Sequence, residues 1–282
     1  MKIFESQQPL KQWLNEHKKP GNSLGFVPTM GALHEGHLSI VRQSVAENAL
    51  TVCSIFVNPT QFNNKEDFEK YPINIERDIK LLTAAGCDAL FIPHVKEIYP
   101  QTTYLSFDFG DLGHVLEGVH RPGHFSGVAT ILSKLFHIVQ PDRAYFGMKD
   151  YQQLAIIRCM VRELSFPIEI IGCETVREAS GLAMSSRNER LSTATRTKAG
   201  SIFHTLNAFS NNISVKNWPL IREQIIQNLT AQLPIAIEYV ELGDPDTLQP
   251  LPLSYDKSYG VLFFAGVLEG VRLIDNITIK IS

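Results

Sequence analysis

Cysteine is scarce in this chain, and its spacing excludes the common roles of cysteine clusters. The four cysteines, Cys53, Cys87, Cys159 and Cys173, are scattered, and none forms a CxxC pair. Disulfide-dependent secreted domains are much richer in cysteine, and cysteine-based zinc sites need closely spaced pairs. We therefore expect buried, reduced thiols in a cytoplasmic protein.

The sequence also lacks an excess of charge of either sign. It carries 26 basic and 29 acidic residues, for a formal net charge of -3. Proteins that bind nucleic acid through bulk electrostatics carry a basic excess, so no nucleic-acid partner is expected. A local basic pocket for a small anion is still compatible with this composition.

Long apolar runs are absent as well. The longest, VLFFAGVL at 261–268, is shorter than the roughly 20 residues that a membrane-spanning helix needs. The opening segment, MKIFESQQPLKQWLNEHKK, has no apolar stretch of the kind found in signal peptides. With 44% hydrophobic and 20% charged residues in 282, the composition predicts a globular protein with a sizeable core and no membrane partner.

Strands and helices are predicted to alternate through the first part of the chain. The segments 23–28, 38–48 and 50–57 have the patterns of a buried strand, an amphipathic helix and a second buried strand. Such a unit implies parallel strands joined by a right-handed crossover. The same alternation predicts helices at 74–85, 126–138 (with Ser126 a candidate N-cap) and 150–164, and strands at 88–92, 143–147 and 168–172.

The pattern changes near residue 177, where helices come first and consecutive strands follow. The predicted helices are 193–210 and 219–232, and the predicted strands are 235–241, 260–267 and 271–275. This order is typical of an α+β unit. We predict an α/β fold with a Rossmann-like, doubly wound parallel sheet over 1–176 and a smaller α+β lid domain over 177–282. Ligands of such sheets bind at the carboxyl ends of the strands, where the second domain would close a cleft.

Two histidines lie in PTMGALHEGH (28–37), between the first predicted strand and the following helix. Gly31 and Gly36 allow close approach of the backbone, and a helix start offers free N–H groups to an anion such as phosphate. His34 and His37 can project from one side of the turn and donate hydrogen bonds to phosphate oxygens. A metal site would need a third ligand that is not obvious nearby. Phosphate binding is favoured over a metal site and over a purely structural helix start.

Two further clusters follow predicted strands. Asn58 and Gln61 come just after 50–57, and their amides can orient a polar substrate, although an Asn-Pro turn is the simpler explanation. Lys149, Asp150 and Gln153 follow 143–147. Lysine there suits phosphate and aspartate suits Mg²⁺ or a ribose hydroxyl, while a capped surface helix is the alternative.

Two more clusters complete the set. Ser185, Ser186 and Arg187 can form a compact phosphate clamp or simply a polar loop. Arg121 and His124, beside a glycine turn, can contribute charge or fix a loop. The convergence of several such clusters on strand ends favours a shared phosphate site.

Taken together, PTMGALHEGH, FVNPTQF, RPGHFSGV, FGMKDYQQL and GLAMSSRN, in this order and spacing, resemble the pantothenate synthetase (pantoate–β-alanine ligase) family. The resemblance runs from about Gly25 to the C-terminus. HxGH alone would indicate only the wider nucleotidyltransferase-like superfamily, whereas the five motifs together are specific.

This resemblance implies ATP-dependent condensation of (R)-pantoate with β-alanine to pantothenate, AMP and pyrophosphate through a pantoyl adenylate. It also implies a requirement for Mg²⁺, closure of the smaller domain, and a cytoplasmic homodimer. The main alternative is another HxGH nucleotidyltransferase acting on a phosphorylated acceptor, and a non-catalytic nucleotide-binding protein is a third hypothesis. The motifs offer no obvious base for the β-alanine amine, with His34 or His37 only candidates.

The resemblance also assigns residues. The expected ATP contacts are Met30, Gly31, His34, Gly36, His37, Gly147, Lys149, Asp150, Val176, Met184, Ser185, Ser186 and Arg187. His34, His37, Lys149 and Arg187 are the expected catalytic residues among them. Gln61 and Gln153 match glutamines that hold pantoate, with Asn58 near the same pocket. No metal ligand is assigned beyond Asp150 as a candidate. The family's usual GEKD element reads GMKD here, so we expect Met148 to be peripheral.

Overall fold

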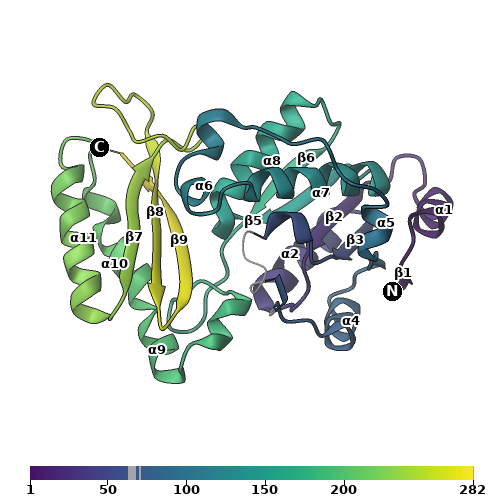
Figure 1. The fold of residues 1–282 in the computed structure, drawn as a ribbon, viewed down its shortest axis with the longest axis horizontal. Coiled ribbons are helices and arrows are strands. Elements are labelled where there is room, and N and C mark those ends of the chain that lie inside the picture. The colour runs from purple at the N-terminus through teal and green to yellow at the C-terminus, as the bar shows by residue number, and fades with distance from the viewer. Residues whose placement is uncertain (63–67, 70, 282) are drawn as a thin grey trace.

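The computed structural model describes residues 1–62, 68–69 and 71–281, and these residues form two separate sheets (Figure 1). A six-stranded parallel sheet comes first, and a three-stranded antiparallel sheet lies near the C-terminus. Helices flank both sheets. The predicted fold class, a doubly wound parallel sheet followed by a smaller α+β unit, is confirmed.

The order of the larger sheet places a crevice at its centre. Its strands, in the spatial order β1-β4-β3-β2-β5-β6, are β1 (Lys2–Phe4), β4 (Ala89–Phe91), β3 (Leu50–Ile55), β2 (Leu24–Thr29), β5 (Arg143–Gly147) and β6 (Glu169–Cys173). From β2 the chain builds one way through β3 and β4 and the other way through β5 and β6. The switch between the two directions falls at β2 and β5, where open α/β sheets bind ligands.

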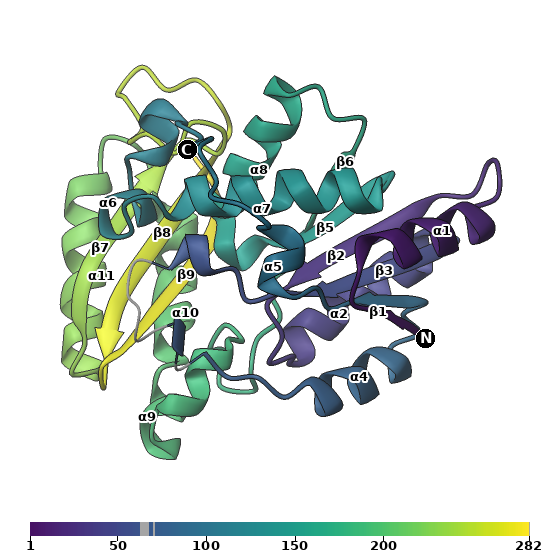
Figure 2. The ribbon, with the colours of Figure 1, turned by 45° about the vertical axis from the view of Figure 1, so that its right-hand side comes forward.

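Helices cover both faces of this sheet (Figure 2). One layer contains α1 (Gln7–His17), α7 (His124–Val139) and α8 (Tyr151–Glu163), and the other contains α2 (Glu35–Glu47) and α4 (Ile75–Ala84). Two short helices, α5 (Val95–Ile98) and α6 (Glu117–His120), lie in the connection that leads to α7. Because both faces are covered, a central strand such as β3 is buried along almost its whole length and shows no alternation of apolar and polar residues.

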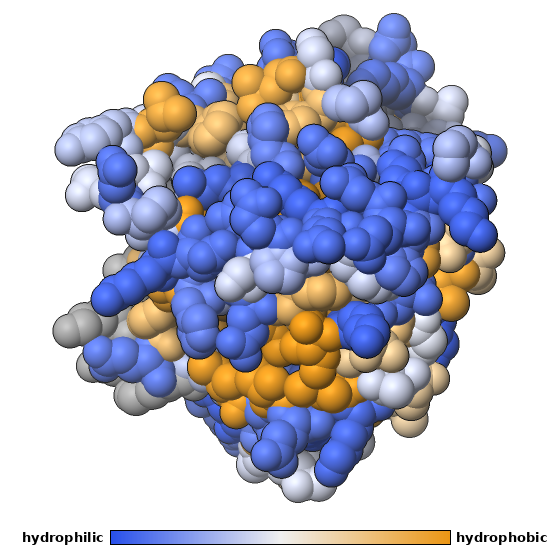
Figure 3. Space-filling model, turned by 90° about the vertical axis from the view of Figure 1, so that its right-hand side faces the viewer, coloured by the Kyte–Doolittle hydropathy of each residue, from blue (hydrophilic) through white to orange (hydrophobic). Residues whose placement is uncertain are grey.

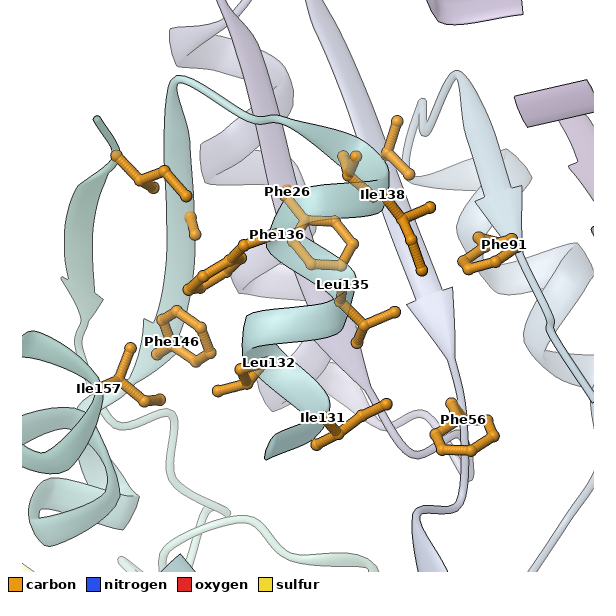
Figure 4. Close-up of a cluster of buried hydrophobic side chains, with 14 of the residues drawn as sticks. Phe26, Phe56, Phe91, Ile131, Leu132, Leu135, Phe136, Ile138, Phe146 and Ile157 are labelled. Atoms are coloured by element: carbon orange, nitrogen blue, oxygen red, sulfur yellow. The ribbon is translucent and has the colours of Figure 1, made fainter. Parts of the chain in front are cut away.

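Helix α7 is the centre of the larger core (Figure 4). Its Phe136 meets Phe26 of β2 edge-on, with ring centroids 6.4 Å apart. Full burial of one such side chain contributes about 1.5–3 kcal/mol. The packing fixes the helix on the sheet, and with it the position of His124 at the helix start.

The smaller sheet has a core of its own. It contains β7 (Ala236–Gly243), β8 (Tyr259–Leu268) and β9 (Val271–Lys280), and it is preceded by α9 (Thr193–Lys198), α10 (Ser201–Phe209) and α11 (Trp218–Gln232). Residues of α10 and α11 pack on one face of the sheet. Val261 and Phe263 of β8 pack with Ala155 of α8 on the other face. Strand β8 is therefore buried on both sides, which explains the run VLFFAGVL.

Two predicted helices differ from the structure. Helix α7 begins at His124, and its N-cap is Gly123 with φ 79°; the hydroxyl of Ser126 instead accepts a hydrogen bond from the backbone N–H of Phe107 at 2.9 Å. The single helix predicted over 193–210 is two helices. They part near Gly200, where an added Cβ would lie 1.8 Å from the carbonyl oxygen of Ser180.

Strand β1 and helix α1 were not predicted, and β1 is too short to give a periodic signal. Strand β9 was predicted over 271–275, but it continues to Lys280. All four cysteines are free thiols, with Cys159 half-buried and the others buried. In the part of the chain that the structure describes, no helix is both long enough and apolar enough to cross a bilayer.

Candidate active site

A cleft opens where β2, β3, β5 and β6 end, facing the C-terminal part of the chain. Apart from Gly31, every residue expected from the sequence to contact ATP or pantoate lines this cleft. The lining also includes Arg121 and His124. The five sequence motifs, far apart in the chain, thus meet at one place.

The loop after β2 is held by a buried carboxylate. Asp78 of α4 is fully buried, and its two oxygens accept the backbone N–H groups of Ala32 and Leu33, each at 2.9 Å. Gly31 lies behind the cleft wall with φ 83°, where an added Cβ would lie 3.1 Å from the Asp78 carboxylate. Gly31 therefore shapes the loop that leads to His34 and does not line the cleft. No sequence signal linked Asp78 to this loop.

The two histidines of the HxGH motif lie together at the start of α2. Their ring centroids are 4.0 Å apart. The backbone N–H of His34 donates to Nδ1 of His37 at 3.4 Å, which leaves Nε2 of His37 to carry the proton. Nδ1 of His34 is buried without a hydrogen-bond partner among the described residues.

Burial makes both imidazoles neutral at pH 7. It lowers the pKa of His34 to about 4, with a further contribution from the charge of Lys149. Burial also lowers the pKa of His37 to about 3, and His34 adds to this effect. The histidines thus face the cleft as neutral hydrogen-bonding groups and not as cations.

The amide pair after β3 is fixed from behind. Asn58 is 1% exposed, and its Nδ2 donates to Oε1 of Gln61 and to the carbonyl of Gly127, both at 3.1 Å. The Tyr99 hydroxyl donates to Oδ1 of Asn58 at 2.8 Å. The Nε2 group of Gln61 lies 2.9 Å from Sδ of Met30. Asn58 is saturated by these bonds, and its main effect on the cleft is to set the position of Gln61.

The turn between β5 and α8 supplies a lysine and an aspartate. Lys149 Nζ lies 3.7 Å from Oδ1 of Asp150, whose side chain is 51% exposed. Its position in the cleft removes part of its hydration, which opposes ionisation of Asp150, but the charges of Lys149, Arg121 and Arg187 outweigh this effect and lower the pKa of the carboxyl. Met148 packs against the large core instead of lining the cleft, as expected of a peripheral position.

The opposite wall is a short antiparallel turn followed by the serine–arginine loop. Arg177 and Ala183 form an isolated β-bridge, and the Met184 N–H donates to the carbonyl of Val176 at 3.0 Å. Ser185 then accepts the N–H of Arg187 at 3.3 Å. This arrangement presents Met184 to Arg187 toward the strand ends across the cleft.

Arg121 and His124 were noted in sequence but not assigned a ligand. The Nδ1 of His124 pairs with the carbonyl of Gln61 at 2.9 Å, so the ring must donate there and Nε2 is unprotonated. Burial, reinforced by Arg121, lowers the pKa of His124 to about 4. Burial, reinforced by Arg187, lowers the pKa of Arg121. The positive charges of Arg121 and Arg187 make this end of the cleft attractive to anions.

The donor set suits a nucleotide-bound cation better than a protein-caged metal. Within the described ranges, no group of three or more His, Cys, Asp or Glu side chains could hold a metal ion. Mg²⁺ in nucleotide sites is commonly held by one or two carboxylates together with substrate phosphates. Asp150 provides one half-exposed carboxylate beside Lys149, which fits that arrangement.

Comparison with known proteins gives consistent matches over the whole chain. A family model described as pantoate-beta-alanine ligase matches residues 2–278. The pantothenate synthetase of Cytophaga hutchinsonii is 51% identical over 276 residues, covering 97% of this chain and 98% of that protein. That of Bacteroides thetaiotaomicron is 46% identical over 283 residues, covering 99% of each.

Solved structures match equally well. A crystal structure of pantothenate synthetase from Thermus thermophilus is similar with a TM-score of 0.87 and 41% identity, covering 98% of this chain and 99% of that one. A pantoate-beta-alanine ligase from Francisella tularensis, complexed with β-γ ATP and β-alanine, has a TM-score of 0.81 and 35% identity, with coverage of 98% and 97%.

Proposed function

The chain belongs to the pantoate-β-alanine ligase family, and we propose that its cleft joins (R)-pantoate to β-alanine at the expense of ATP, giving pantothenate, AMP and pyrophosphate. The observation that carries this proposal is the meeting of the five family motifs in one cleft at the switch point of the sheet. A Rossmann-like sheet supplies the frame, and loops after its strands supply the polar groups.

In the first step the pantoate carboxylate, ionised at neutral pH, attacks the α-phosphorus of ATP. A bond forms between the carboxylate oxygen and phosphorus, and the bond to the bridging oxygen breaks, so that pyrophosphate leaves. No base is required. The barrier is lowered by alignment and by stabilising the charge on the phosphates.

The chain divides that work between neutral donors and cations. We assign hydrogen-bond donation to His34 and His37, and charge neutralisation to Lys149 and Arg187. We propose that the remaining residues expected from the sequence to contact ATP do so. Gly31 is the exception, because it acts through the shape of its loop. Loss of one preorganised donor of this kind typically costs about 10²–10³ in rate.

Gln61 and Gln153 are assigned to pantoate. Both line the cleft, and Gln61 is held by the buried Asn58 behind it. Primary amides can donate to the carboxylate or accept from a hydroxyl of the substrate without adding charge. This suits a substrate whose carboxylate has to remain nucleophilic, since a strong ion pair would stabilise its ground state.

In the second step the neutral amine of β-alanine attacks the acyl carbon of the adenylate, the bond from that carbon to the phosphate oxygen breaks so that AMP leaves, and the nitrogen releases a proton to solvent. His34, His37 and His124 have pKa values of about 3 to 4 in the free protein, which makes them weak bases at pH 7. We propose that the unprotonated Nε2 of His124 orients the amine by accepting one of its hydrogens, while His34 and His37 keep their contacts with the phosphates. Arg121 lies at the same end of the cleft and is assigned to the β-alanine carboxylate.

Mg²⁺, the metal ion that the family resemblance implies is bound together with ATP, would be held by Asp150 and the phosphates. When bound, it would offset the negative charge of the phosphates. This assignment rests on the half-exposed Asp150 carboxylate at the cleft.

We further propose a division into domains 1–176 and 177–282, with the second closing over the cleft. The separate hydrophobic core of the C-terminal part, whose first buried member is Leu182, supports it.

A cytoplasmic homodimer is proposed from the family resemblance. The end of the molecule that carries α1 and β1 is mainly hydrophilic but shows several apolar areas, with an extended one in the lower half of the view (Figure 3), and such areas often mark association surfaces.

Pyrophosphate exchange tests the proposed function directly. The protein should incorporate labelled pyrophosphate into ATP when pantoate is present and β-alanine is absent, because formation of the adenylate is reversible. Pantothenate should appear only when β-alanine is added. No exchange from a folded sample that binds ATP would refute the adenylate route, and nucleotidyl transfer to a phosphorylated acceptor would favour another HxGH enzyme.

A further inference from the structure

Two adjacent residues of β9, Asp275 and Asn276, lie outside all five motifs and contact both walls of the cleft. They are 5% and 7% exposed. Adjacent residues of a strand point to opposite faces, so the two side chains reach different partners. Strand β9 belongs to the small sheet, whereas one of these partners belongs to the large part of the molecule.

Asn276 holds the turn that carries the catalytic lysine. Its Nδ2 donates to the carbonyl of Met148 at 3.0 Å and to the carbonyl of Lys149 at 2.8 Å. One amide nitrogen therefore uses both of its hydrogens on consecutive carbonyls of one turn. The orientation of this turn sets the direction in which Lys149 enters the cleft.

Asp275 holds the opposite wall. Its carboxylate accepts two hydrogen bonds from Arg177, at 2.7 and 2.9 Å, and the Arg177 guanidinium also lies 3.7 Å from the ring centroid of Phe203. Arg177 donates to the carbonyl of Gly181 at 3.2 Å as well. Through its bridge to Ala183, Arg177 fixes the segment that continues into the serine–arginine loop.

The two residues are also hydrogen-bonded to each other. The backbone N–H of Asn276 donates to Oδ1 of Asp275 at 2.8 Å. The register of β9 against β8 fixes both backbones, with Phe264 opposite Asp275 and Phe263 opposite Asn276. The distance between the two walls is thus set by one rigid strand.

We infer that Asp275 and Asn276 are positioning residues that hold Lys149 at a fixed distance from the Ser185–Arg187 loop, so that both walls engage one triphosphate at once. The inference rests on the proposed function and adds to it two residues outside the motifs. Two groups that act on the same transition state must be placed accurately, and an error of about 1 Å can cost around 10²-fold in rate.

A double-mutant cycle tests whether Asn276 acts through Lys149. In the otherwise unchanged protein, Asn276→Ala should lower the maximal rate of pantoate-dependent pyrophosphate exchange about 10- to 100-fold and change the KM for ATP much less. In a Lys149→Ala background the same substitution should cost no more than about threefold, because the group that it positions is gone. Equal losses in both backgrounds would overturn the inference.

Two further variants separate positioning from folding. Asn276→Asp keeps the side-chain volume but turns a carboxylate oxygen toward two carbonyls, so its loss of exchange should be at least as large as that of Asn276→Ala. Asn207→Ala, at an exposed position of α10, is the matched control and should leave exchange within about twofold. Thermal unfolding shows whether each variant is folded.

The outcomes distinguish the two proposals. If the unmodified protein shows no exchange, the proposed function fails and the positioning role has no reaction to act on. If it exchanges normally and folded Asn276→Asp does too, the positioning inference fails while the proposed function stands.

Discussion

Replacing His37 by glutamine asks whether the HxGH histidines act as neutral donors or as cations. Glutamine can donate a hydrogen bond but cannot carry positive charge. If His37 works as a neutral donor, His37→Gln should retain much of the adenylation rate, within about 10- to 30-fold, while His37→Ala should lose at least about 100-fold. The pair of variants separates the hydrogen bond from the charge.

The lowered pKa values set the free energy that a cationic mechanism would need in order to protonate the histidine rings at pH 7. With a pKa of about 4 for His34 and about 3 for His37, charging either ring at pH 7 costs about 4 and about 5 kcal/mol, at 1.36 kcal/mol per pH unit. Only about one His34 ring in a thousand is then charged in the free protein. Because both pKa values are lowered, the neutral forms dominate above about pH 4 and remain dominant at higher pH.

The assay is pantoate-dependent pyrophosphate exchange, from which kcat/KM for ATP is determined between pH 6 and 8. The values are corrected for the ionisation of ATP itself. This ratio reports ionisations of the free enzyme. We expect no fall attributable to the histidines across this range. A tenfold fall per pH unit above about pH 6.5 that disappears in His37→Gln would show that the imidazolium is the active form, and would refute the neutral-donor reasoning.

Three further predictions concern the supports of the cleft. Asp78→Asn, which removes one of two acceptors for the backbone of the loop before α2, should lower exchange about tenfold or more; a rate within twofold of the unmodified protein would contradict the role of that carboxylate. Gly200→Ala should lower the free energy of unfolding by about 3 kcal/mol in denaturant titrations, because its Cβ would lie 1.8 Å from the carbonyl oxygen of Ser180. Burial opposes ionisation of Glu117, but Arg272 outweighs this effect and lowers the pKa of that carboxyl. The stability that Glu117 contributes is therefore present above the pKa of the unfolded state, about 4.5, and is lost as pH falls through the pKa of the folded state. Glu117→Gln should therefore unfold at a lower temperature than the unmodified protein at pH 7, with a difference that shrinks at pH 4; an equal difference at both values would disprove this linkage.

Sequence patterns predicted the large sheet well because its strands are buried on both faces and its helices have one apolar side. They could not predict β1, whose three residues are too few for a periodicity. They also joined α9 to α10, because the close approach of Gly200 to Ser180 depends on a contact that only the folded chain makes. Local signals fail where a tertiary contact decides.

The candidate site shows the same division. The residues that face the cleft stand in dense motifs, so their types and spacing pointed to an anion site and, through the family, to ATP. Asp78, Asp275 and Asn276 hold those motifs from distant parts of the chain, and each looks in sequence like an ordinary polar residue of a helix or strand. Their roles depend on hydrogen bonds to backbone groups or to Arg177, which no sequence spacing encodes.

The two hydrophobic cores have a spectroscopic consequence. The chain has two tryptophans, and each packs against a different core: Trp13 of α1 against the larger one and Trp218 of α11 against the smaller one. Each residue is thus an intrinsic fluorophore for one half of the molecule. In Trp13→Phe the remaining emission reports on the C-terminal core, and in Trp218→Phe on the N-terminal core, so the loosening of either half can be followed by fluorescence without an added label.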